Sequence, residues 1–420
     1  MVVRRKGNRV EKFIARQPIF DSSRATVAYE LLFRSGTANF FSGLNVDLAC
    51  TSTADNLFLF GLDRLTQGRR AFINCSRDFL IREYAALLPR DRVVIEILET
   101  VQMDREVIEA CRRLKQTGYV IALDDFIDAP EWAPLVAIAD IIKVDFLLSS
   151  PDEQERMARD YSRRNIRMLA EKVETYADFE RARQYGYSYF QGYFFSRPEI
   201  LTHHDIPAYK LSFVRVLQAA NRPEIDEEEV ATAIKSEASL SYRLLRYLNS
   251  PVFSLVTEVS SIPHALRLLG ERGIRRWVSL VAIACMGDDK PQELLTLPLV
   301  RARFCELLAP LAGHKSAAND LFLMGLLSAI DAILDMKMED ILEEIAIRDE
   351  IRQALLGGHN AFRDIFDIVK LYEKGSWAEF EAACGRVGIP AEAGTELYMS
   401  STDWALAMLS GEELTETKSA

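Results

Sequence analysis

The first half of the chain alternates short apolar runs with segments of helical length. The apolar runs occur from about residue 14 to about residue 195 and are rich in β-branched residues. Such runs predict buried strands, and their alternation with helices predicts a parallel sheet covered by helices. The number of repeats suits a closed (β/α) barrel, and a doubly wound open sheet is the competing fold. The predicted helices span residues 46–62, 104–117, 152–164 and 176–185.

Most of the apolar runs end on a carboxylate, an amide or a lysine. In residues 118–126, GYVIALDDF, two adjacent carboxylates follow the run, and the carboxyl ends of parallel strands are where such folds place their chemistry. Alternation along a strand sends neighbouring side chains to opposite faces, so only a bend would bring both to one ion, and one of them could cap the next helix instead. The residues at the run ends are Glu30, Asn74, Glu96 with Glu99, Asp124 with Asp125, Lys143 with Asp145, Glu171 with Glu174, and Gln191.

These residue types predict a metal site. One such residue alone is more often a helix cap, a solvated charge or part of an internal ion pair, whereas seven run ends of one type indicate a shared site. Four or five carboxylates with an amide oxygen, and no cysteine or histidine, suit Mg²⁺ or Mn²⁺ and are poor ligands for zinc. Paired ions would neutralise a phosphodiester and activate water, and Lys143 could position that water.

The second half of the chain has helical periodicity from residues 203–204 to about residue 409. Three start signals support it: Asp226 precedes a run of glutamates, Pro263 occupies a tolerated first-turn position, and Ser376 with Glu379 forms a capping box. A bundle or solenoid of helices is the simplest prediction, with the last ten residues frayed. The predicted helices span residues 209–220, 227–235, 239–248, 262–269, 274–286, 299–311, 319–334, 341–347, 361–373 and 377–384.

Composition excludes several classes of protein. The net charge of −11 argues against a broad surface for a nucleic-acid backbone, so an anionic ligand would need bound cations or a local basic cluster. The longest strongly apolar run, residues 277–286, is about half the roughly 20 residues that span a bilayer. The six cysteines lie far apart without a CxxC motif. We therefore expect a cytoplasmic protein with neither disulfides, zinc nor a membrane segment.

Residues 13–198 resemble the EAL family of cyclic di-GMP phosphodiesterases. The family signature Glu-x-Leu-x-Arg corresponds to residues 30–34, ELLFR, and the other run-end residues fall on the remaining motif positions in order. The resemblance implies a TIM-like barrel that binds cyclic di-GMP with one or two Mg²⁺ or Mn²⁺ ions, and that can form a homodimer. It implies metal ligands Glu30, Asn74, Glu96, Asp124 and Asp125, catalytic residues Lys143, Glu171 and Glu99, and ligand contacts from Gln17, Leu32, Arg34, Glu174 and Gln191.

The chain departs from the family after the two aspartates. The family has a Gly-x-Gly loop there, whereas residues 127–132 of this chain are IDAPEW, and Leu98 replaces the threonine between the two glutamates. Glycines permit conformations that isoleucine and proline cannot adopt, so this loop must follow another path. Two functions follow: a phosphodiesterase that makes pGpG with weak activity, or a receptor or adaptor that binds cyclic di-GMP without turnover.

Residues 234–283 resemble the HDOD domain, a helical relative of HD hydrolases that lacks their catalysis. Residues 239–250, SLSYRLLRYLNS, and 262–270, IPHALRLLG, carry the resemblance. Catalytic HD proteins have Gly-Leu-Leu-His-Asp in a later helix, and residues 325–329 here are GLLSA, which removes both metal ligands. We expect an output module that presents a surface to a protein partner.

The expected domains are a barrel over residues 1–203, an HDOD-like domain over 204–410 and a tail over 411–420. The one dense basic cluster of the second domain comprises Arg267, Arg272, Arg275 and Arg276. We expect these arginines to be solvated and paired with nearby acids rather than to bind an anion.

Overall fold

The structure is a computed structural model that describes residues 12–35, 61–196, 208–222, 224–249 and 259–410. It divides into two compact units that are not consecutive in sequence. The first comprises residues 1–195, 370–385 and 390–395, and the second comprises 196–369, 386–389 and 396–420. The domain boundary expected at residue 203 lies in residues 197–207, outside the described part of the chain.

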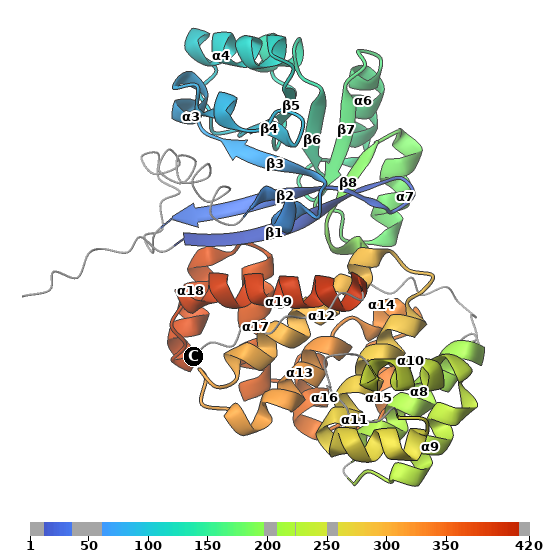
Figure 1. The fold of residues 1–420 in the computed structure, drawn as a ribbon. Coiled ribbons are helices and arrows are strands. Elements are labelled where there is room, and N and C mark those ends of the chain that lie inside the picture. The colour runs from blue at the N-terminus through green and yellow to red at the C-terminus, as the bar shows by residue number, and fades with distance from the viewer. Residues whose placement is uncertain (1–11, 36–60, 197–207, 223, 250–258, 411–420) are drawn as a thin grey trace, which may run out of the picture. The chain divides into compact units, whose positions relative to one another are not determined.

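The first unit is built on a closed barrel of eight strands (Figure 1). Strands follow one another in chain order around the barrel; β1 is antiparallel to β2 and β8, and the others pair in parallel. The barrel prediction is confirmed, and the open doubly wound sheet was wrong. The strands are β1 (Lys12–Asp21), β2 (Thr26–Ser35), β3 (Arg70–Cys75), β4 (Val93–Ile97), β5 (Val120–Leu123), β6 (Ile141–Asp145), β7 (Arg167–Glu171) and β8 (Tyr189–Gln191).

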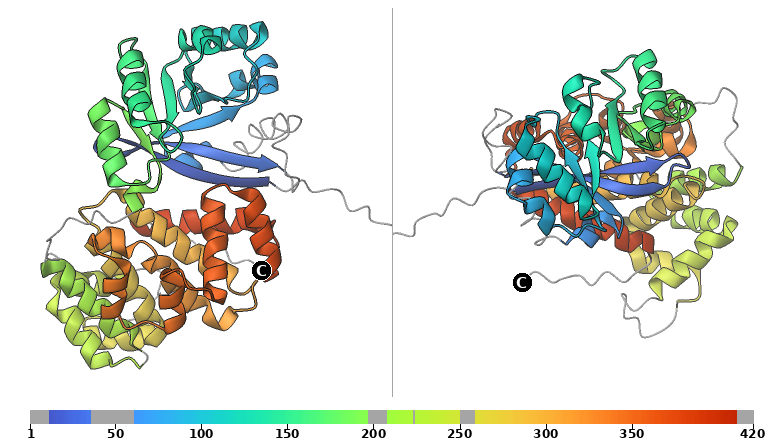
Figure 2. Two further views of the ribbon diagram at one scale, coloured as in Figure 1. Left: turned by 180° about the vertical axis from the view of Figure 1, so that it is seen from behind. Right: turned by 90° about the horizontal axis from the view of Figure 1, so that it is seen from above.

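Helices connect the strands and lie on the outside of the barrel (Figure 2). Their starts follow side-chain capping: Ser76, Asp104 and Thr175 each accept a backbone hydrogen bond, and Ser150 forms a capping box with Glu153. The predicted helix at 46–62 lies almost wholly outside the described residues. The elements are α2 (Leu62–Thr66), α3 (Arg77–Ile81), η1 (Tyr84–Leu87), α4 (Arg105–Gln116), η2 (Pro130–Trp132), α5 (Ala133–Val136), α6 (Pro151–Ser162), α7 (Tyr176–Tyr185) and η3 (Tyr193–Ser196).

An apolar layer fills the barrel near the amino ends of its parallel strands. Because strand side chains alternate between the two faces, the inward positions of neighbouring strands stack in layers. This layer consists of the buried residues Ile19, Ala28, Phe72, Val94, Ala122, Ile141 and Leu169. It forms the apolar floor of the barrel and leaves the carboxyl ends of the strands for polar side chains.

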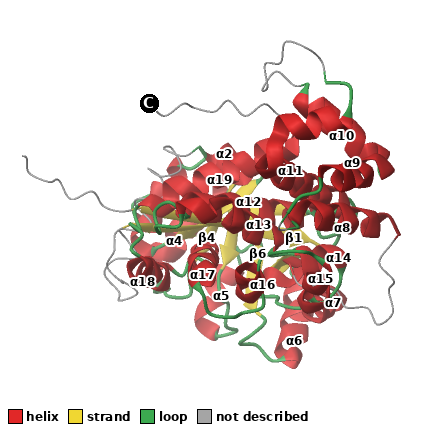
Figure 3. Cartoon of the chain, turned by 90° about the horizontal axis from the view of Figure 1, so that it is seen from below, coloured by secondary structure: helices red, strands yellow, loops and turns green. Residues whose placement is uncertain are grey.

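The described elements after the barrel are all helices (Figure 3). The helical prediction is confirmed: Asp226 caps its helix by accepting bonds from two backbone N–H groups, and Pro263 lies in a first turn. The elements are α8 (Ala208–Asn221), α9 (Glu227–Ser236), α10 (Ala238–Leu248), α11 (Ile262–Met286), α12 (Gln292–Leu308), η5 (Lys315–Ala317), α13 (Ala318–Leu327), α14 (Ile330–Leu334), α15 (Met338–Glu344), α16 (Asp349–Leu355), α17 (Ala361–Glu373), α18 (Trp377–Val387) and α19 (Ala393–Ser410).

Several helix boundaries differ from the periodicity, and α16 and α19 lie outside the predicted ranges. Helix α11 joins two predicted helices across Gly270, which has a positive φ and kinks it. Helix α12 begins at Gln292, before the predicted start at residue 299, and contains Pro298. The predicted helix at 319–334 is divided into α13 and α14. Every helix in the described part of the chain is too short or too polar to cross a bilayer.

Candidate functional site

A polar layer lies directly above the apolar floor of the barrel. On six strands the inward residue two positions after the apolar one is polar, as the period of a strand requires. These pairs are Ala28 and Glu30 in β2, Phe72 and Asn74 in β3, Val94 and Glu96 in β4, Ala122 and Asp124 at the end of β5, Ile141 and Lys143 in β6, and Leu169 and Glu171 in β7. Strand β1 runs in the opposite direction, so its matching polar residue, Gln17, precedes Ile19.

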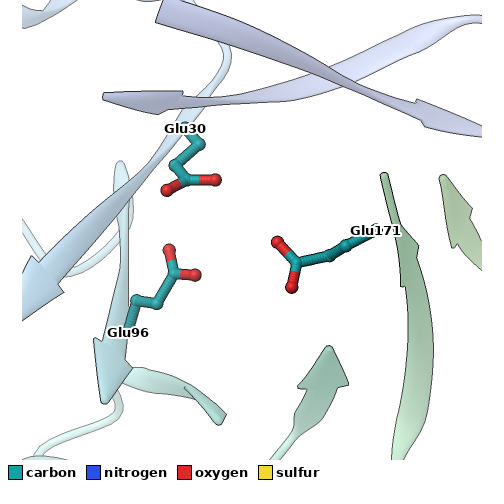
Figure 4. Close-up of side chains that lie close together, drawn as sticks. All are labelled: Glu30, Glu96 and Glu171. Carbon is teal, nitrogen blue, oxygen red and sulfur yellow. The ribbon is translucent and has the colours of Figure 1, made fainter. Parts of the chain in front are cut away.

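The amino group of Lys143 lies among the carboxylates of this layer. Its Nζ is 2.7 Å from Glu171 Oε1, 2.8 Å from Asp124 Oδ1 and 3.3 Å from Glu30 Oε2, and it also contacts Glu96. The Lys143 side chain is 1% exposed. Figure 4 shows the three glutamates directed toward one another from different strands. Burial of this many charges requires mutual pairing or a bound cation.

Amide side chains hold the Glu30 carboxylate from two sides. Asn74 Nδ2 donates to Glu30 Oε1 at 3.0 Å, and Gln191 Nε2 donates to Glu30 Oε2 at 2.7 Å. Gln191 also donates to Gln17 Oε1 at 3.1 Å. Side chains from β1, β3 and β8 thereby fix the Glu30 carboxylate of β2, as a preorganised ligand requires.

Both aspartates after β5 reach the site. Oxygens of Asp124, Asp125 and Glu171 lie within 4.8 Å of one another. Asp125 has a φ of 38°, so the backbone turns into the left-handed region directly after the strand. This bend overrides the strict alternation of a strand and directs both carboxylates to the same region. The prediction that a bend would be needed is confirmed, and neither aspartate caps a helix.

The pKa values show an excess of negative charge. Burial raises the pKa of Glu171 to about 8 and that of Glu96 well above its usual range. Although burial opposes it, the Lys143 ammonium lowers the pKa of Asp124. Burial also opposes protonation of Lys143, yet the four surrounding carboxylates raise its pKa well above the usual value. One lysine does not neutralise the layer, so without another cation some of its carboxyls hold protons near neutral pH.

The donor set fits a hard divalent cation. Oxygens of Glu30, Glu96 and Glu171 lie within 4.8 Å of one another and form a second group that could hold an ion. The buried Oε2 atoms of Glu96 and Glu171 accept no hydrogen bond from the described residues. Carboxylate and amide oxygens without sulfur or imidazole are the ligands of Mg²⁺, Mn²⁺ and Ca²⁺.

The loop after Asp125 is short and tied to α6. Phe126 N donates to Lys143 O at 3.0 Å, and the Phe126 ring packs edge-on against Trp132 and Tyr161. Asp128 accepts hydrogen bonds from Tyr161 and Arg156, each 2.5 Å long. These contacts hold residues 127–132 close to α6, at the position where the EAL family has its Gly-x-Gly loop. Partial desolvation and the charges of Asp124 and Asp125 raise the pKa of Glu99, which lies on the exposed rim nearby.

The remaining expected residues lie outside the polar layer. Leu32 is two residues beyond Glu30 on β2 and partly buried, and Glu174 lies in the turn between β7 and α7. The side chain of Arg34 is outside the described part of the structure. Sequence reasoning missed Lys172, which contacts Asp145 and lies 3.4 Å from Asp125. Its position directly after Glu171, at the end of an apolar run, was the sequence signal that could have identified it.

Asp145 has a local structural role. Its Oδ1 accepts hydrogen bonds from the backbone N–H groups of Leu147 and Leu148 at 2.7 and 3.1 Å, which closes the turn after β6. It therefore stabilises a loop and pairs with Lys172, as a polar residue at a strand end often does.

Two of the four arginines in the basic cluster of the second unit pair with acids, as expected. Arg275 contacts Glu271 at 2.6 Å, and Arg276 contacts Glu306 at 2.5 Å. Both groups of acidic or metal-ligating side chains that come close enough for an ion, among the described residues, belong to the barrel. The described helices therefore provide no second metal site of that kind.

Two full-length relatives resemble this chain. YuxH, an uncharacterized protein of Bacillus subtilis, is 34% identical over 403 residues, covering 93% of this chain and 97% of the relative. The cyclic di-GMP phosphodiesterase CdgJ of Vibrio cholerae is 34% identical over 400 residues, covering 94% of this chain and 92% of the relative.

Solved structures also align with the chain. The Bacillus subtilis YkuI protein, in complex with cyclic di-GMP and calcium, has 18% identity and a TM-score of 0.38, over 62% of this chain and 73% of that one. BlrP1 of Klebsiella pneumoniae, in a calcium and cyclic di-GMP complex, has 22% identity and a TM-score of 0.37, over 47% and 58%.

Family models assign the two parts of the chain. The EAL domain model matches residues 72–198, and the HDOD domain model matches residues 206–359. Both relatives share about a third of their residues with this chain over nearly its whole length. The order of the two matches is the order that the sequence resemblance predicts. The chain belongs to the family of proteins in which an EAL domain is followed by an HDOD domain.

Proposed function

We propose that the barrel binds cyclic di-GMP and hydrolyses it to linear pGpG with Mg²⁺ or Mn²⁺. The observation that carries the proposal is the buried layer of Glu30, Glu96, Asp124 and Glu171 around Lys143, at the carboxyl end of the barrel. CdgJ, which is 34% identical over almost the whole chain, is named a cyclic di-GMP phosphodiesterase. A pure binding protein would have no need for a lysine buried among so many acids.

Each residue has a role that its contacts support. Glu30, Asn74, Glu96, Asp124 and Asp125 would hold one or two ions, and Asn74 orients Glu30 by donating to it. A bound divalent ion would neutralise the phosphodiester and lower the pKa of the attacking water. Lys143 keeps its proton, because its neighbours raise its pKa, and so can donate a hydrogen bond to that water.

Other side chains would meet the nucleotide around this layer. Gln191 and Gln17 are joined to each other and, through Gln191, to Glu30, so they would hold a ligand group beside the metals. Leu32 and Arg34 follow Glu30 along β2, and Glu174 follows Glu171, and we propose that these three residues contact the nucleotide outside the metals. Glu171 accepts from Lys143, and Glu99 stands at the rim beside the aspartates.

The second candidate is a receptor that binds cyclic di-GMP without turnover. The loop at residues 126–132 favours it, because Asp128 is tied to Tyr161 and Arg156, and Phe126 packs on Trp132. A loop held this way has less freedom to close over the second metal than a glycine loop. Weak turnover and no turnover are both compatible with a bound nucleotide.

We propose that the helical part is an output module for a protein partner and that the barrel can form homodimers. The absence of a second cluster of ligating residues in the described helices supports a binding role rather than catalysis. Pull-down from lysate with full-length protein, with and without cyclic di-GMP, tests this role; an identical set of partners would contradict it. The described cysteines are buried and form no disulfide with one another, which supports a reducing, cytoplasmic location.

The deciding experiment separates binding from turnover. Purified protein is incubated with cyclic di-GMP and Mg²⁺ or Mn²⁺, and pGpG and bound nucleotide are measured separately for wild type, Lys143→Ala and Glu30→Ala. Lys115→Ala is the matched control, since Lys115 pairs with Asp140, outside the polar layer. Turnover lost only in the two site variants establishes the enzyme, binding without pGpG in wild type establishes the receptor, and no binding with either metal refutes both.

A further inference from the structure

The barrel unit is completed by residues from near the end of the chain. Residues 370–385 and 390–395, here called the C-terminal segment, belong to the same compact unit as the strands. The EAL match ends at residue 198 and the HDOD match ends at residue 359, so neither family model includes this segment. It comprises the end of α17, most of α18 and the first residues of α19.

Aromatic side chains of the C-terminal segment cover the first residues of β1. The Phe13 ring stacks on Trp377 with a centroid distance of 5.4 Å and meets Phe380 edge-on at 5.7 Å. Tyr372 packs edge-on against both Trp377 and Phe380 at 5.1 Å. All four rings are buried. These are the offset and edge-on arrangements that aromatic groups favour, so the packing is specific rather than incidental.

A hydrogen bond joins the segment to the open edge of β1. Strand β8 pairs with β1 only from Ile19 to Asp21, so within the described part of the chain the first half of β1 has a sheet partner on its β2 side alone. Tyr372 donates its hydroxyl hydrogen to Ile14 O at 3.0 Å. It also shares a 3.0 Å bond with Thr395, which must donate because a tyrosine has a single hydroxyl hydrogen. The segment therefore protects an exposed strand edge.

The segment contacts the strand that carries Glu30. Gly375 has a φ of +68°, and a Cβ on it would lie 2.8 Å from Leu32 Cδ1. In the β1–β2 pairing Phe13 faces Arg34, Ala15 faces Leu32, and Gln17 faces Glu30. Paired residues of antiparallel strands share a face, and so do residues two apart. One face of this hairpin thus bears Glu30 and Gln17 at one end and is covered by the C-terminal segment at the other.

We propose that the C-terminal segment positions the nucleotide site by fixing the end of the β1–β2 hairpin. Gly375 packs against Leu32. Tyr372 bonds to Ile14, and Trp377 stacks on Phe13. Together these contacts fix the position of the backbone from Glu30 to Arg34. The identity of the ligand in this inference rests on the proposed function. The packing of the C-terminal segment on the hairpin is independent of that function. The segment is a positioning element, because it acts through its contacts with Phe13, Ile14 and Leu32 of the β1–β2 hairpin.

The test compares two glycines with the same backbone conformation. Gly375→Ala strains a positive φ and also overlaps Leu32. Gly388→Ala strains a similar φ of +77°, but no described atom lies within 4 Å of the added Cβ. A third variant, Gly375→Ala with Leu32→Val, removes the overlapping Cδ1, and Tyr372→Phe removes only the hydroxyl. All variants are made in the full-length chain.

Three measurements distinguish the possible outcomes: hydrogen exchange of residues 13–35, Mn²⁺ affinity, and cyclic di-GMP affinity. We expect Gly375→Ala and Tyr372→Phe to speed exchange in the hairpin about tenfold and to weaken nucleotide binding about fivefold, with partial recovery in the double variant. Gly388→Ala should match wild type in all three. Faster exchange without any loss of ligand affinity, or equal effects of the two glycine variants, overturns the proposal.

Failure of the proposed function gives a different result. If wild-type protein does not bind cyclic di-GMP, that function is refuted, and Mn²⁺ affinity with hydrogen exchange still decides whether the segment positions Glu30. A fivefold loss of Mn²⁺ affinity in Gly375→Ala, with none in Gly388→Ala, then supports the positioning role. Unchanged Mn²⁺ affinity then overturns it.

Discussion

Lys143→Met would leave four carboxylates facing one another without the ammonium that contacts them all. Lys143 is 1% exposed, and the side chains of Glu30, Glu96 and Glu171 are 8%, 0% and 8% exposed, so water cannot replace the lost charge. Methionine fills similar space and adds no charge. The variant therefore tests electrostatics rather than packing.

The magnitude follows from the distances. A charge pair about 3 Å apart attracts by roughly 5–6 kcal/mol at an effective dielectric constant near 20. Burial of the ammonium costs several kcal/mol and offsets much of this gain. Removal of one partner from a buried ion pair costs about 3–5 kcal/mol, because the other charge stays buried. In the absence of metal we therefore expect Lys143→Met to lose about 3–5 kcal/mol of unfolding free energy. This corresponds to a fall in Tm of roughly 6–20 °C for a domain of 150–250 residues.

The loss should depend on pH and on metal. Without Lys143 the pKa values of the acids rise further, so the folded variant binds more protons than the unfolded chain above about pH 4.5. Its stability then falls as pH rises, and the difference from wild type is larger at pH 8.5 than at pH 5.5. A divalent ion at about 100 times its Kd adds roughly 2.7 kcal/mol, and it should bind the variant more tightly than wild type.

Thermal melting in EDTA and in Mn²⁺, at both pH values, checks these expectations. Lys115→Met is the matched control, because Lys115 pairs with Asp140 outside the polar layer and the two side chains are 36% and 34% exposed. Exposed pairs contribute about 0–1 kcal/mol, so its melting temperature should hardly change. A loss in Lys143→Met that is equal at both pH values and insensitive to Mn²⁺ would refute the electrostatic reasoning.

Three further substitutions probe other parts of the molecule. Gly325→Ala should lower stability by about 1–3 kcal/mol in thermal melts, because the new Cβ would lie 2.6 Å from Ala302 Cα on the neighbouring helix. Asp331→Asn should flatten the pH dependence of urea unfolding between about pH 4 and 6: burial raises the pKa of Asp331 to about 6, so the folded state binds the extra proton and its stability falls as pH rises, by up to about 3 kcal/mol at 1.36 kcal/mol per pKa unit. Tyr161→Phe should speed hydrogen exchange in residues 126–132, because it removes the bond to Asp128.

Each of these has a clear contradicting result. Gly385→Ala is the control for Gly325→Ala, since no described atom lies within 4 Å of its added Cβ, and equal losses would exclude the helix contact as the cause. An unchanged pH profile in Asp331→Asn would assign the pH dependence to another group. Exchange in residues 126–132 that equals wild type would mean that the other contacts of the loop hold it without the Tyr161 hydroxyl.

The barrel and the core of its site could be predicted from the sequence. Parallel strands in register stack their inward residues, so a polar residue two positions beyond an apolar one on several strands must converge with its neighbours. Glu30, Glu96, Lys143 and Glu171 follow from this rule alone. Each run also had strong β propensity and a helix after it, so local and global preferences agreed.

The remaining features depend on tertiary structure that periodicity does not encode. The positive φ of Asp125 follows from the turn that its neighbours make, and aspartate only tolerates it. Apolar spacing in 377–384 predicts which face of the helix is buried, but it does not say that Phe13 covers it. A contact between residues more than 350 positions apart has no signal in local sequence.

The noncontiguous barrel unit affects how the chain is made. A ribosome that has completed β8 must still add roughly 180 residues before Tyr372 and Trp377 exist, which takes about 10–35 s at 5–20 residues per second. During that time Phe13 and the open edge of β1 are without their final cover, and such edges are prone to mispairing. In a truncated chain that ends after the barrel, these residues stay uncovered permanently. We therefore expect such a chain to aggregate more readily than the full-length protein.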